Sequence, residues 1–284
     1  MKVRKPTMDY SEVPLYWSDN HEFAQRWNAG SFVPAYIEPF LVKVLNEAKP
    51  LLDTRNKQLA RDVEIFIKQE MEHCKQHVKF NRRFWSFGYD ELKPLETAFA
   101  KDYDDWMKTK SLRFRLAYCE GFEAMSAISV TAIFEESDEF FETADQNVVD
   151  LWKWHLAEEY EHRCVMYDVF HQLYCKNPVT GYFWRIYGLL YAMVHLGGFT
   201  AKASKVLLDK DRSTMTPDQL AQSLENEKRA KKALGRPALK HLLEILSPFY
   251  RPARRRPPRG VDAYLGEGFP RVSVTNSAAV VASA

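Results

Sequence analysis

The chain has 284 residues, which is long enough for one large domain with an ample hydrophobic core. Its 40 basic and 38 acidic side chains leave a formal net charge of +2, so charge gives no reason to expect nucleic acid or an acidic partner. Only 11 glycines occur, and long stretches without glycine or proline favour helices. The four cysteines form no Cys-x-x-Cys pair, so we expect small buried thiols in a reducing compartment.

Residues 1–30 are rich in aromatic and polar side chains, and we expect them to form an irregular N-terminal arm. No apolar run follows the basic residues near the start, which argues against a secretory signal and favours a cytoplasmic location. Residues 31–250 are expected to form one helical domain that binds metal.

Four main helices are expected within this domain. The first covers Phe32–Ala48 and contains Glu38 followed by Pro39, a proline that either opens the helix or kinks it. The second runs from a cap at Thr54 to about Phe84. A shorter crossing helix and the two remaining main helices are expected at residues 92–108, 111–134 and 145–173. No hairpin pattern is visible, so the sequence predicts an all-α fold built on a four-helix bundle.

Tyr182–Phe199 is the most apolar segment of the chain, although Arg185 and His195 interrupt it. A membrane-spanning helix needs about 20 predominantly apolar residues, so this segment is short for that role. We favour a buried core helix, and a membrane-facing or lipid-tail-binding helix is the alternative. Additional C-terminal helices are expected after Thr216-Pro217 and over residues 237–246.

Residues 251–284 change in character and are expected to form a tail with little regular structure. The segment begins with five arginines within nine residues, interspersed with prolines, and ends in small residues. Such a tail either contacts an anionic surface, such as a membrane, or is solvated without a specific role.

Two histidine–carboxylate triplets have helical spacing, Glu70-x-x-His73-x-x-x-His77 and His155-x-x-x-Glu159-x-x-His162. Residues three and four apart share one face of a helix, so each triplet points its side chains in the same direction. Two inward-facing Glu-x-x-His motifs form half of a carboxylate-bridged two-metal site in a four-helix bundle. The other half needs one glutamate from each of two further helices.

The first and third main helices supply these glutamates. Glu38 lies in the apolar stretch AYIEPFL, where a lone carboxylate is costly to bury, and the alternative is a cap at the surface. The third helix carries Glu120 and Glu123 one turn apart, and we favour Glu123 as the ligand, with Glu120 supporting it or adding a ligand. Glu158 points about 100° away from Glu159 and is expected outside the site.

The metal ligands that the sequence predicts are therefore Glu38, Glu70, His73, Glu123, His155, Glu159 and His162. The alternative role for His155 is that of a hydrogen-bond partner to a ligand. His77 shares the face of His73, and its role is open between direct ligation and support.

These motifs resemble a bacterial family known as predicted metal-dependent hydrolases. That family carries a Gln-Glu-x-x-His-x-x-x-His run, which begins at Gln69 here, and a Trp-His-x-x-Glu-Glu-x-x-His run, which begins at Trp154. Its short Pro-Gly-Glu stretch on the first helix has lost the glycine here, but Glu38 is retained. More broadly, the chain resembles ferritin-like di-iron carboxylate proteins. His155 matches a third histidine of arylamine N-oxygenases, and His77 replaces the radical-forming tyrosine of ribonucleotide reductase small subunits.

The resemblance implies two bound metal ions, with iron favoured over manganese or zinc. We expect an oxidase or oxygenase that uses O₂ on an organic, hydrophobic substrate. No flavin, nicotinamide or iron–sulfur motif is visible, so a separate reductase or ferredoxin would supply electrons. The alternatives are hydrolysis by a water bridging two metals and non-catalytic iron binding. A homodimer remains open, as does peripheral membrane contact through Tyr182–Phe199 or the arginine-rich tail.

Overall fold

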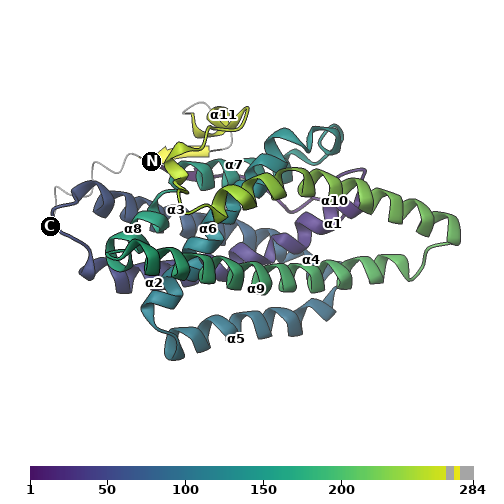
Figure 1. Ribbon diagram of the computed structural model, residues 1–284. Coiled ribbons are helices and arrows are strands. Elements are labelled where there is room, and N and C mark those ends of the chain that lie inside the picture. Colours follow the sequence, from purple (N-terminus) through teal and green to yellow (C-terminus); the bar gives the residue numbers. More distant parts are fainter. Residues whose placement is uncertain (267–271, 276–284) are drawn as a thin grey trace.

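The structure is a computed structural model that describes residues 1–266 and 272–275 (Figure 1). Over these residues the fold is all-α, as predicted, and the sheet found there is one antiparallel pair of short strands, β1 (Val3–Pro6) and β2 (Val272–Thr275). The ferritin-like description of the bundle stays a prediction. The α-helices are α1 (His21–Gly30), α2 (Phe32–Ala48), α3 (Lys57–Asn81), α4 (Arg83–Ser86), α5 (Lys93–Thr109), α6 (Leu112–Glu135), α7 (Gln146–His162), α8 (Val165–Tyr174), α9 (Pro178–Arg212), α10 (Pro217–Leu246) and α11 (Val261–Leu265).

The helix boundaries follow local side-chain chemistry. The Asn56 side chain caps α3 by accepting a hydrogen bond from the backbone of Leu59, so the cap expected at Thr54 is wrong by two residues. Pro39 lies inside α2 and does not open it. A proline has no N–H to bond the carbonyl four residues earlier, and here the Cys74 thiol donates to that carbonyl, on Ala35, at 3.6 Å.

The N-terminal 30 residues are not an irregular arm. They contain β1 and α1, and α1 begins at an Asn20 cap whose side chain accepts from the Phe23 backbone. Phe23 and Trp27 of α1 are buried in the core, which explains the aromatic richness of this segment. Both elements are short, and their partners lie far along the chain, so neither gives a strong periodic pattern. The division into domains at residues 30 and 250 stays a prediction.

The fourth main helix is broken rather than continuous. It divides after His162 into α7 and α8. At the break, the Arg163 side chain donates to the carbonyls of Tyr160 and Pro252, and a side chain bonded to a helix carbonyl in this way is a common feature of helix breaks. Part of the expected tail is also structured, because α11 and β2 lie beyond residue 251, and residues 267–271 and 276–284 lie outside the described range.

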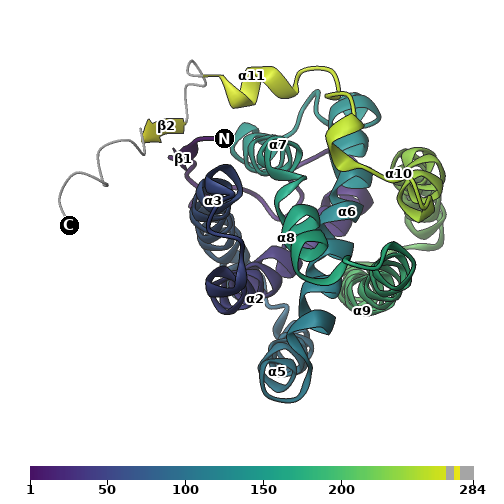
Figure 2. The ribbon, with the colours of Figure 1, turned by 60° about the vertical axis from the view of Figure 1, so that its left-hand side comes forward.

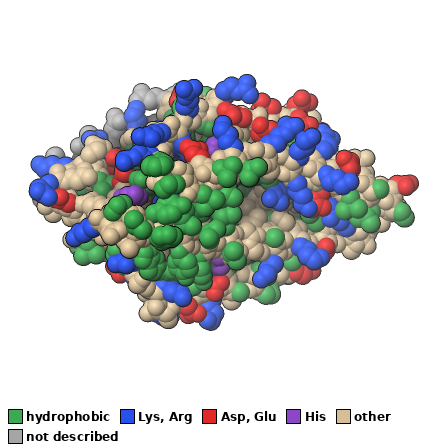
Figure 3. Space-filling model, viewed as in Figure 1, with side chains coloured by type: hydrophobic (Ala, Val, Ile, Leu, Met, Phe, Trp, Pro, Cys, Tyr) green, Lys and Arg blue, Asp and Glu red, His purple; other side chains and the backbone are tan. Residues whose placement is uncertain are grey.

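The apolar segment Tyr182–Phe199 belongs to the 35-residue helix α9 and has two distinct faces. One face is buried and includes Leu189 and Leu196, as the core interpretation predicted. The opposite face is exposed, with Phe183 at 65% and Val194 at 78% of full exposure. Figure 3 shows hydrophobic side chains gathered over this helix and the adjoining end of α10. In the described part of the chain, no helix is both long and apolar enough to cross a membrane.

Four helices surround the centre of the molecule and carry the candidate metal ligands. Figure 2 looks along the bundle, with α2 and α3 on one side and α6 and α7 beside them. Helix α2 packs on α3, and α6 packs on α7 and α9. The α6–α9 crossing is close because glycines face it: a Cβ on Gly121 would lie 2.6 Å from the Cα of Leu189, and one on Gly188 would overlap Ala117.

This crossing predicts opposite effects of substitution at two glycines of α9. Gly188→Val places methyl groups against the α6 backbone and should destabilise the fold by about 1–3 kcal/mol or more. Gly198→Ala meets no atom within 4 Å and should be neutral or stabilising by up to about 1 kcal/mol, because alanine favours helix. Urea denaturation curves measure both changes. Equal midpoints for the two variants would contradict the close crossing.

Candidate metal centre

The seven ligands expected from the sequence converge at the centre of the bundle. Each is no more than 3% exposed. They come from four helices, with Glu38 on α2, a Glu-x-x-His pair on α3, Glu123 on α6, and His155 with a second Glu-x-x-His pair on α7. The structure therefore brings together every residue of the expected set, and their role as ligands remains to be tested by metal loading.

The residues fall into two groups that share one carboxylate. Glu38, His73, His155 and Glu159 form the first group, and Glu70, Glu123, Glu159 and His162 form the second. Within each group, one possible ligand atom from every residue lies within 4.8 Å of the others. Because Glu159 belongs to both groups, the arrangement has the geometry of two adjacent cation sites bridged by a carboxylate.

Individual contacts place the imidazole nitrogens opposite the carboxylate oxygens. His155 Nε2 lies 3.2 Å from Glu159 Oε1 and 3.6 Å from Glu38 Oε1. On the other side, His162 Nε2 lies 3.2 Å from Glu70 Oε1 and 3.4 Å from Glu159 Oε1. The His73 ring brings Nδ1 to 3.7 Å from Glu159 Oε1. These separations leave room for a cation between the groups, as bonds of about 2.0–2.2 Å to each ligand require.

The buried polar atoms of the cluster fit a pair of metal ions. Both carboxylate oxygens of Glu38, Glu70 and Glu123 lack a hydrogen-bond partner among the described residues. So do the inward nitrogens His73 Nδ1 and His162 Nε2. Buried polar atoms without partners are costly, and inward oxygen and nitrogen lone pairs are what a cation would satisfy. Four carboxylates also carry the charge that balances two divalent ions.

Burial and mutual repulsion determine the protonation of the carboxyl groups. Burial is the largest influence that raises the pKa values of Glu38, Glu70 and Glu123 well above the usual range, and neighbouring carboxylates raise them further. Burial acts in the same direction on Glu159. There the charge of His162 and a hydrogen bond from His155 outweigh it and lower the pKa. The shared carboxylate is therefore the one that the site keeps ionised.

Each inward histidine is held by a partner on its other ring nitrogen. His73 Nε2 contacts Glu158 Oε2 at 3.0 Å, and His162 Nδ1 contacts the Gln69 side chain at 3.2 Å. His155 Nδ1 lies 2.6 Å from His77 Nε2. Such partners fix the orientation and tautomer of a metal-binding imidazole. His77 lies outside both ligand groups and contacts His155, and its own Nδ1 contacts Ser31 Oγ at 2.8 Å, an arrangement that fits the supporting role.

Glu158 contacts a residue of the candidate metal centre, although its position on α7 predicted that it would lie outside the site. Its angular offset keeps it out of the two ligand groups, but directs its carboxylate to the far side of His73. Arg4 of β1 donates to Glu158 at 2.8 Å. Burial raises the pKa of Glu158 to about 8, and Arg4 opposes this increase. Nothing in the spacing of the sequence indicates that Arg4 reaches the site, whereas Gln69 does have a signal, because it precedes Glu70 in the glutamine–glutamate run.

The two carboxylates of α6 have different surroundings. Glu123 belongs to a ligand group, with Oε2 lying 3.5 Å from His162 Nε2. Glu120 points instead towards Arg185 of α9, whose Nη1 lies 3.7 Å from it. Burial raises the pKa of Glu120 to about 7, and the Arg185 charge limits the increase. Glu120 therefore lies outside both ligand groups.

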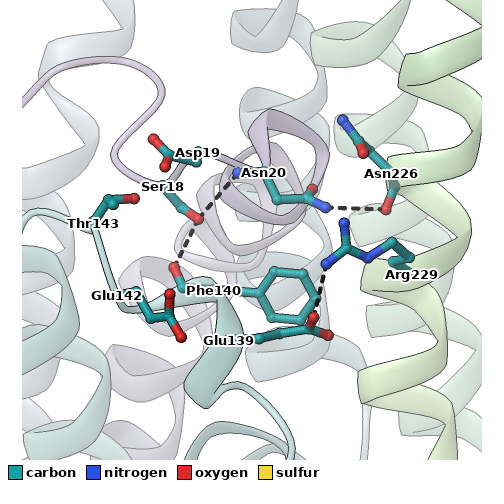
Figure 4. Close-up of a pocket in the computed structure, with 9 residues that line it drawn as sticks. All are labelled: Ser18, Asp19, Asn20, Glu139, Phe140, Glu142, Thr143, Asn226 and Arg229. Carbon is teal, nitrogen blue, oxygen red and sulfur yellow. Dashed lines mark hydrogen bonds and ion pairs between the residues drawn. The ribbon is translucent and has the colours of Figure 1, made fainter.

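A separate small pocket has a different character (Figure 4). It has a volume of about 150 Å³ and is lined by polar residues of the α1 start, the loop before α7, and α10. Its side chains already bond one another: Arg229 pairs with Glu139 at 2.7 Å, and Asn20 donates to the Asn226 carbonyl. None of its lining residues belongs to the ligand groups, so we assign it no function.

Fold and cluster together define an all-α protein with a buried group of glutamates and histidines able to hold metal ions. The chain belongs to the family described as "Predicted metal-dependent hydrolase", whose family model matches residues 2–256. This confirms the narrower resemblance seen in the sequence, and the likeness to ferritin-like oxygenases stays a prediction. No curated protein and no solved structure matches the chain.

Two substitutions on α6 test the ligand assignment. Glu123→Gln removes a ligand charge, so the metal content should fall from about two ions per chain to about one or less. Glu120→Gln is the matched control: it lies on the same helix, is equally buried, and should load fully. Metal content measured by mass spectrometry, with helicity from circular dichroism, distinguishes them. Full loading of the Glu123→Gln protein would contradict the assignment.

The raised pKa values predict how metal binding and pH combine. In the metal-free fold, Glu38, Glu70 and Glu123 keep protons that the unfolded chain releases, so stability should fall as pH rises. Each carboxyl that stays protonated contributes about 1.4 kcal/mol per pH unit. Bound cations would replace these protons, and the loss of stability with rising pH would then disappear. The difference in Tm between loaded and metal-free protein should therefore widen as the pH rises above about 7.

Calorimetry of both forms across this range measures the effect. The lowered pKa values of His73 and His77 add no slope here, because both imidazoles are neutral in the folded and the unfolded chain above about pH 7. Glu158 and Glu120 lie outside the ligand groups, so no bound cation takes the place of their protons. A constant difference in Tm would contradict protonation of the empty ligand set.

Proposed function

We propose that this protein is an enzyme with a dinuclear metal centre that uses O₂ to oxidise an organic substrate. The observation that carries the proposal is the sharing of Glu159 between two ligand groups built from Glu, Glu-x-x-His, Glu and Glu-x-x-His on successive helices. This pattern is the one by which helical bundles hold di-iron and di-manganese centres.

The donor set supports iron or manganese. It combines four carboxylates with three imidazoles, and the four free cysteines contribute no thiolate to either group. Carboxylate and imidazole ligands suit iron and manganese, whereas thiolates favour zinc or iron–sulfur clusters. When bound, two such ions supply the electrons that activate O₂. A separate reductase or ferredoxin restores them, because the sequence carries no motif for a flavin, nicotinamide or iron–sulfur group.

The residues around the cluster orient the ligands and exclude water. Phe66 packs edge-on against His162 with ring centroids 4.5 Å apart, and Trp154 packs against His73 at 4.9 Å. The Glu158 side chain holds His73 at Nε2, and His73 Nδ1 would face the metal ions as a neutral ligand. Arg4 keeps Glu158 in place for this task. The centre is therefore shielded on the side of β1.

Metal-assisted hydrolysis is the second candidate, and the family description favours it. Two bridged cations can lower the pKa of a shared water and position it for attack. The same ligand groups would serve this reaction, with zinc or manganese in place of iron. A non-catalytic iron-binding role would need the ligand groups but no access for an organic molecule.

Loading with metal separates these functions. Protein loaded anaerobically with ferrous iron should consume about one O₂ per pair of irons when oxygen is admitted and should develop a visible absorption band. The Glu159→Ala protein should do neither, because both ligand groups lose a member. Oxygen electrode traces and absorption spectra provide the readout.

Zinc-loaded protein that turns over ester or phosphoester probes without consuming O₂ would support hydrolysis instead. Oxygen uptake that ends in deposited ferric iron beyond two ions per chain would support iron storage. Either result would overturn the oxidase proposal.

A further inference from the structure

A second and much larger pocket leads to the metal centre. It has a volume of about 690 Å³, which lies within the range of pockets that bury small organic ligands. Helices α1, α2, α6, α7, α9 and α10 all contribute to its wall. Two ligands, His155 and Glu159, line its inner end, so a molecule held in the pocket would contact the centre.

We propose that this pocket binds an elongated apolar substrate with one anionic group, and that Arg26 receives the anion while the apolar body extends towards His155. The inference rests on the proposed function, because the pocket ends at the same metal centre, and it adds the chemical class of the substrate.

The lining of the pocket is the reason for proposing an apolar substrate body. Side chains along it are mainly hydrophobic, among them Phe122, Met125, Leu156, Met193 and Leu196. Methionine side chains are flexible and polarisable, so they adapt to chains of variable shape. A wall of this kind offers few hydrogen bonds and favours hydrocarbon over a polyhydroxylated or charged molecule.

Arg26 is the reason for proposing that the substrate carries an anionic group. It lines the pocket and is only partly exposed, and burial lowers the pKa of its guanidinium although the charge of Glu227 opposes this effect. Within the described part of the chain, no hydrogen bond or close ion pair involves the Arg26 side chain. Glu227 instead pairs with Lys231 at 2.6 Å and with Arg212 at 2.8 Å. A guanidinium in this position is suited to a carboxylate, phosphate or sulfate of a ligand.

The order of residues along the pocket sets the orientation. Trp27 follows Arg26 on α1, and its ring packs against Trp152 with centroids 4.6 Å apart. Trp152 lies one turn before His155 on α7. The Trp152 ring in turn stacks on His155 with centroids 6.0 Å apart, so ring contacts run from the neighbour of Arg26 to a residue of the ligand groups. The anion would be bound away from the centre, and a carbon of the apolar body would be the part presented to it.

Glycines leave the pocket open between α9 and α10. Gly197 and Gly235 both line it, and a Cβ added at either would meet no atom within 4 Å. A leucine at position 197 can therefore occupy pocket space without displacing the backbone, and it favours the helix more than glycine does. Gly198 is the next residue of α9, has the same free space, and does not line the pocket, which makes Gly198→Leu a matched control.

Calorimetric titration of the full-length protein with dodecanoate tests the proposal. Wild type should bind it, Gly197→Leu should bind about tenfold more weakly or not at all, and Gly198→Leu should stay within about twofold of wild type. Equal binding by wild type and Gly197→Leu would overturn the pocket as the site.

The anionic group is tested with matched probes. Wild type should prefer dodecanoate and dodecyl phosphate over dodecanol by about tenfold, and Arg26→Met should lose this preference while retaining dodecanol. If dodecanol binds wild type as well as dodecanoate does, the role of Arg26 is wrong. A preference for only one of the two anions identifies the head group and supports the proposal.

Metal content and O₂ uptake are recorded on the same samples, which separates failure of this inference from failure of the proposed function. Normal loading and O₂ uptake without dodecanoate binding in wild type would overturn the substrate class alone. Dodecanoate binding that Gly197→Leu abolishes, in a protein that consumes no O₂, would support the pocket and count against the oxidase.

Discussion

The burial of four carboxylates at one point is the constraint on which the rest of this structure depends. Glu38, Glu70, Glu123 and Glu159 approach one another where water cannot screen them, so the empty site must hold protons or cations to remain folded. The surrounding residues meet this constraint in different ways. Histidines place nitrogens between the oxygens, and Glu158, Gln69 and His77 hold those histidines from behind.

The sequence was informative where the relevant spacing is local. Helical periodicity predicted the convergence of Glu70 with His73 and of Glu159 with His162, because three-residue spacing has one meaning in an α-helix. Glu123, which the sequence favoured over Glu120, belongs to one of the two groups, and its role as a ligand stays a prediction. Supports from distant segments escaped notice, since Arg4 and Ser31 reach the site only through tertiary packing. No spacing rule connects residues more than 40 positions apart.

Hydropathy indicated where the helices lie better than it indicated which face of a helix is buried. Tyr182–Phe199 is the most apolar segment of the sequence, but α9 buries Leu189 and exposes Val194. The mean hydropathy of the segment cannot distinguish the buried face from the exposed face, because both faces carry hydrophobic side chains. The break after His162 was missed for a related reason: it depends on hydrogen bonds from Arg163 to carbonyls that include one 89 residues away, at Pro252.

The glycine contact between α6 and α9 has a mechanical consequence. Gly121 lies between Glu120 and Glu123, and there the two backbones touch without an intervening layer of side chains. Side chains can change rotamer and absorb small shifts, whereas contacting backbones are stiff and transmit them. Because α6 and α9 both line the large pocket and touch at Gly121, a ligand that displaced α9 would also move the helix that carries Glu123. The position of the Glu123 carboxylate would then depend on what the cavity holds.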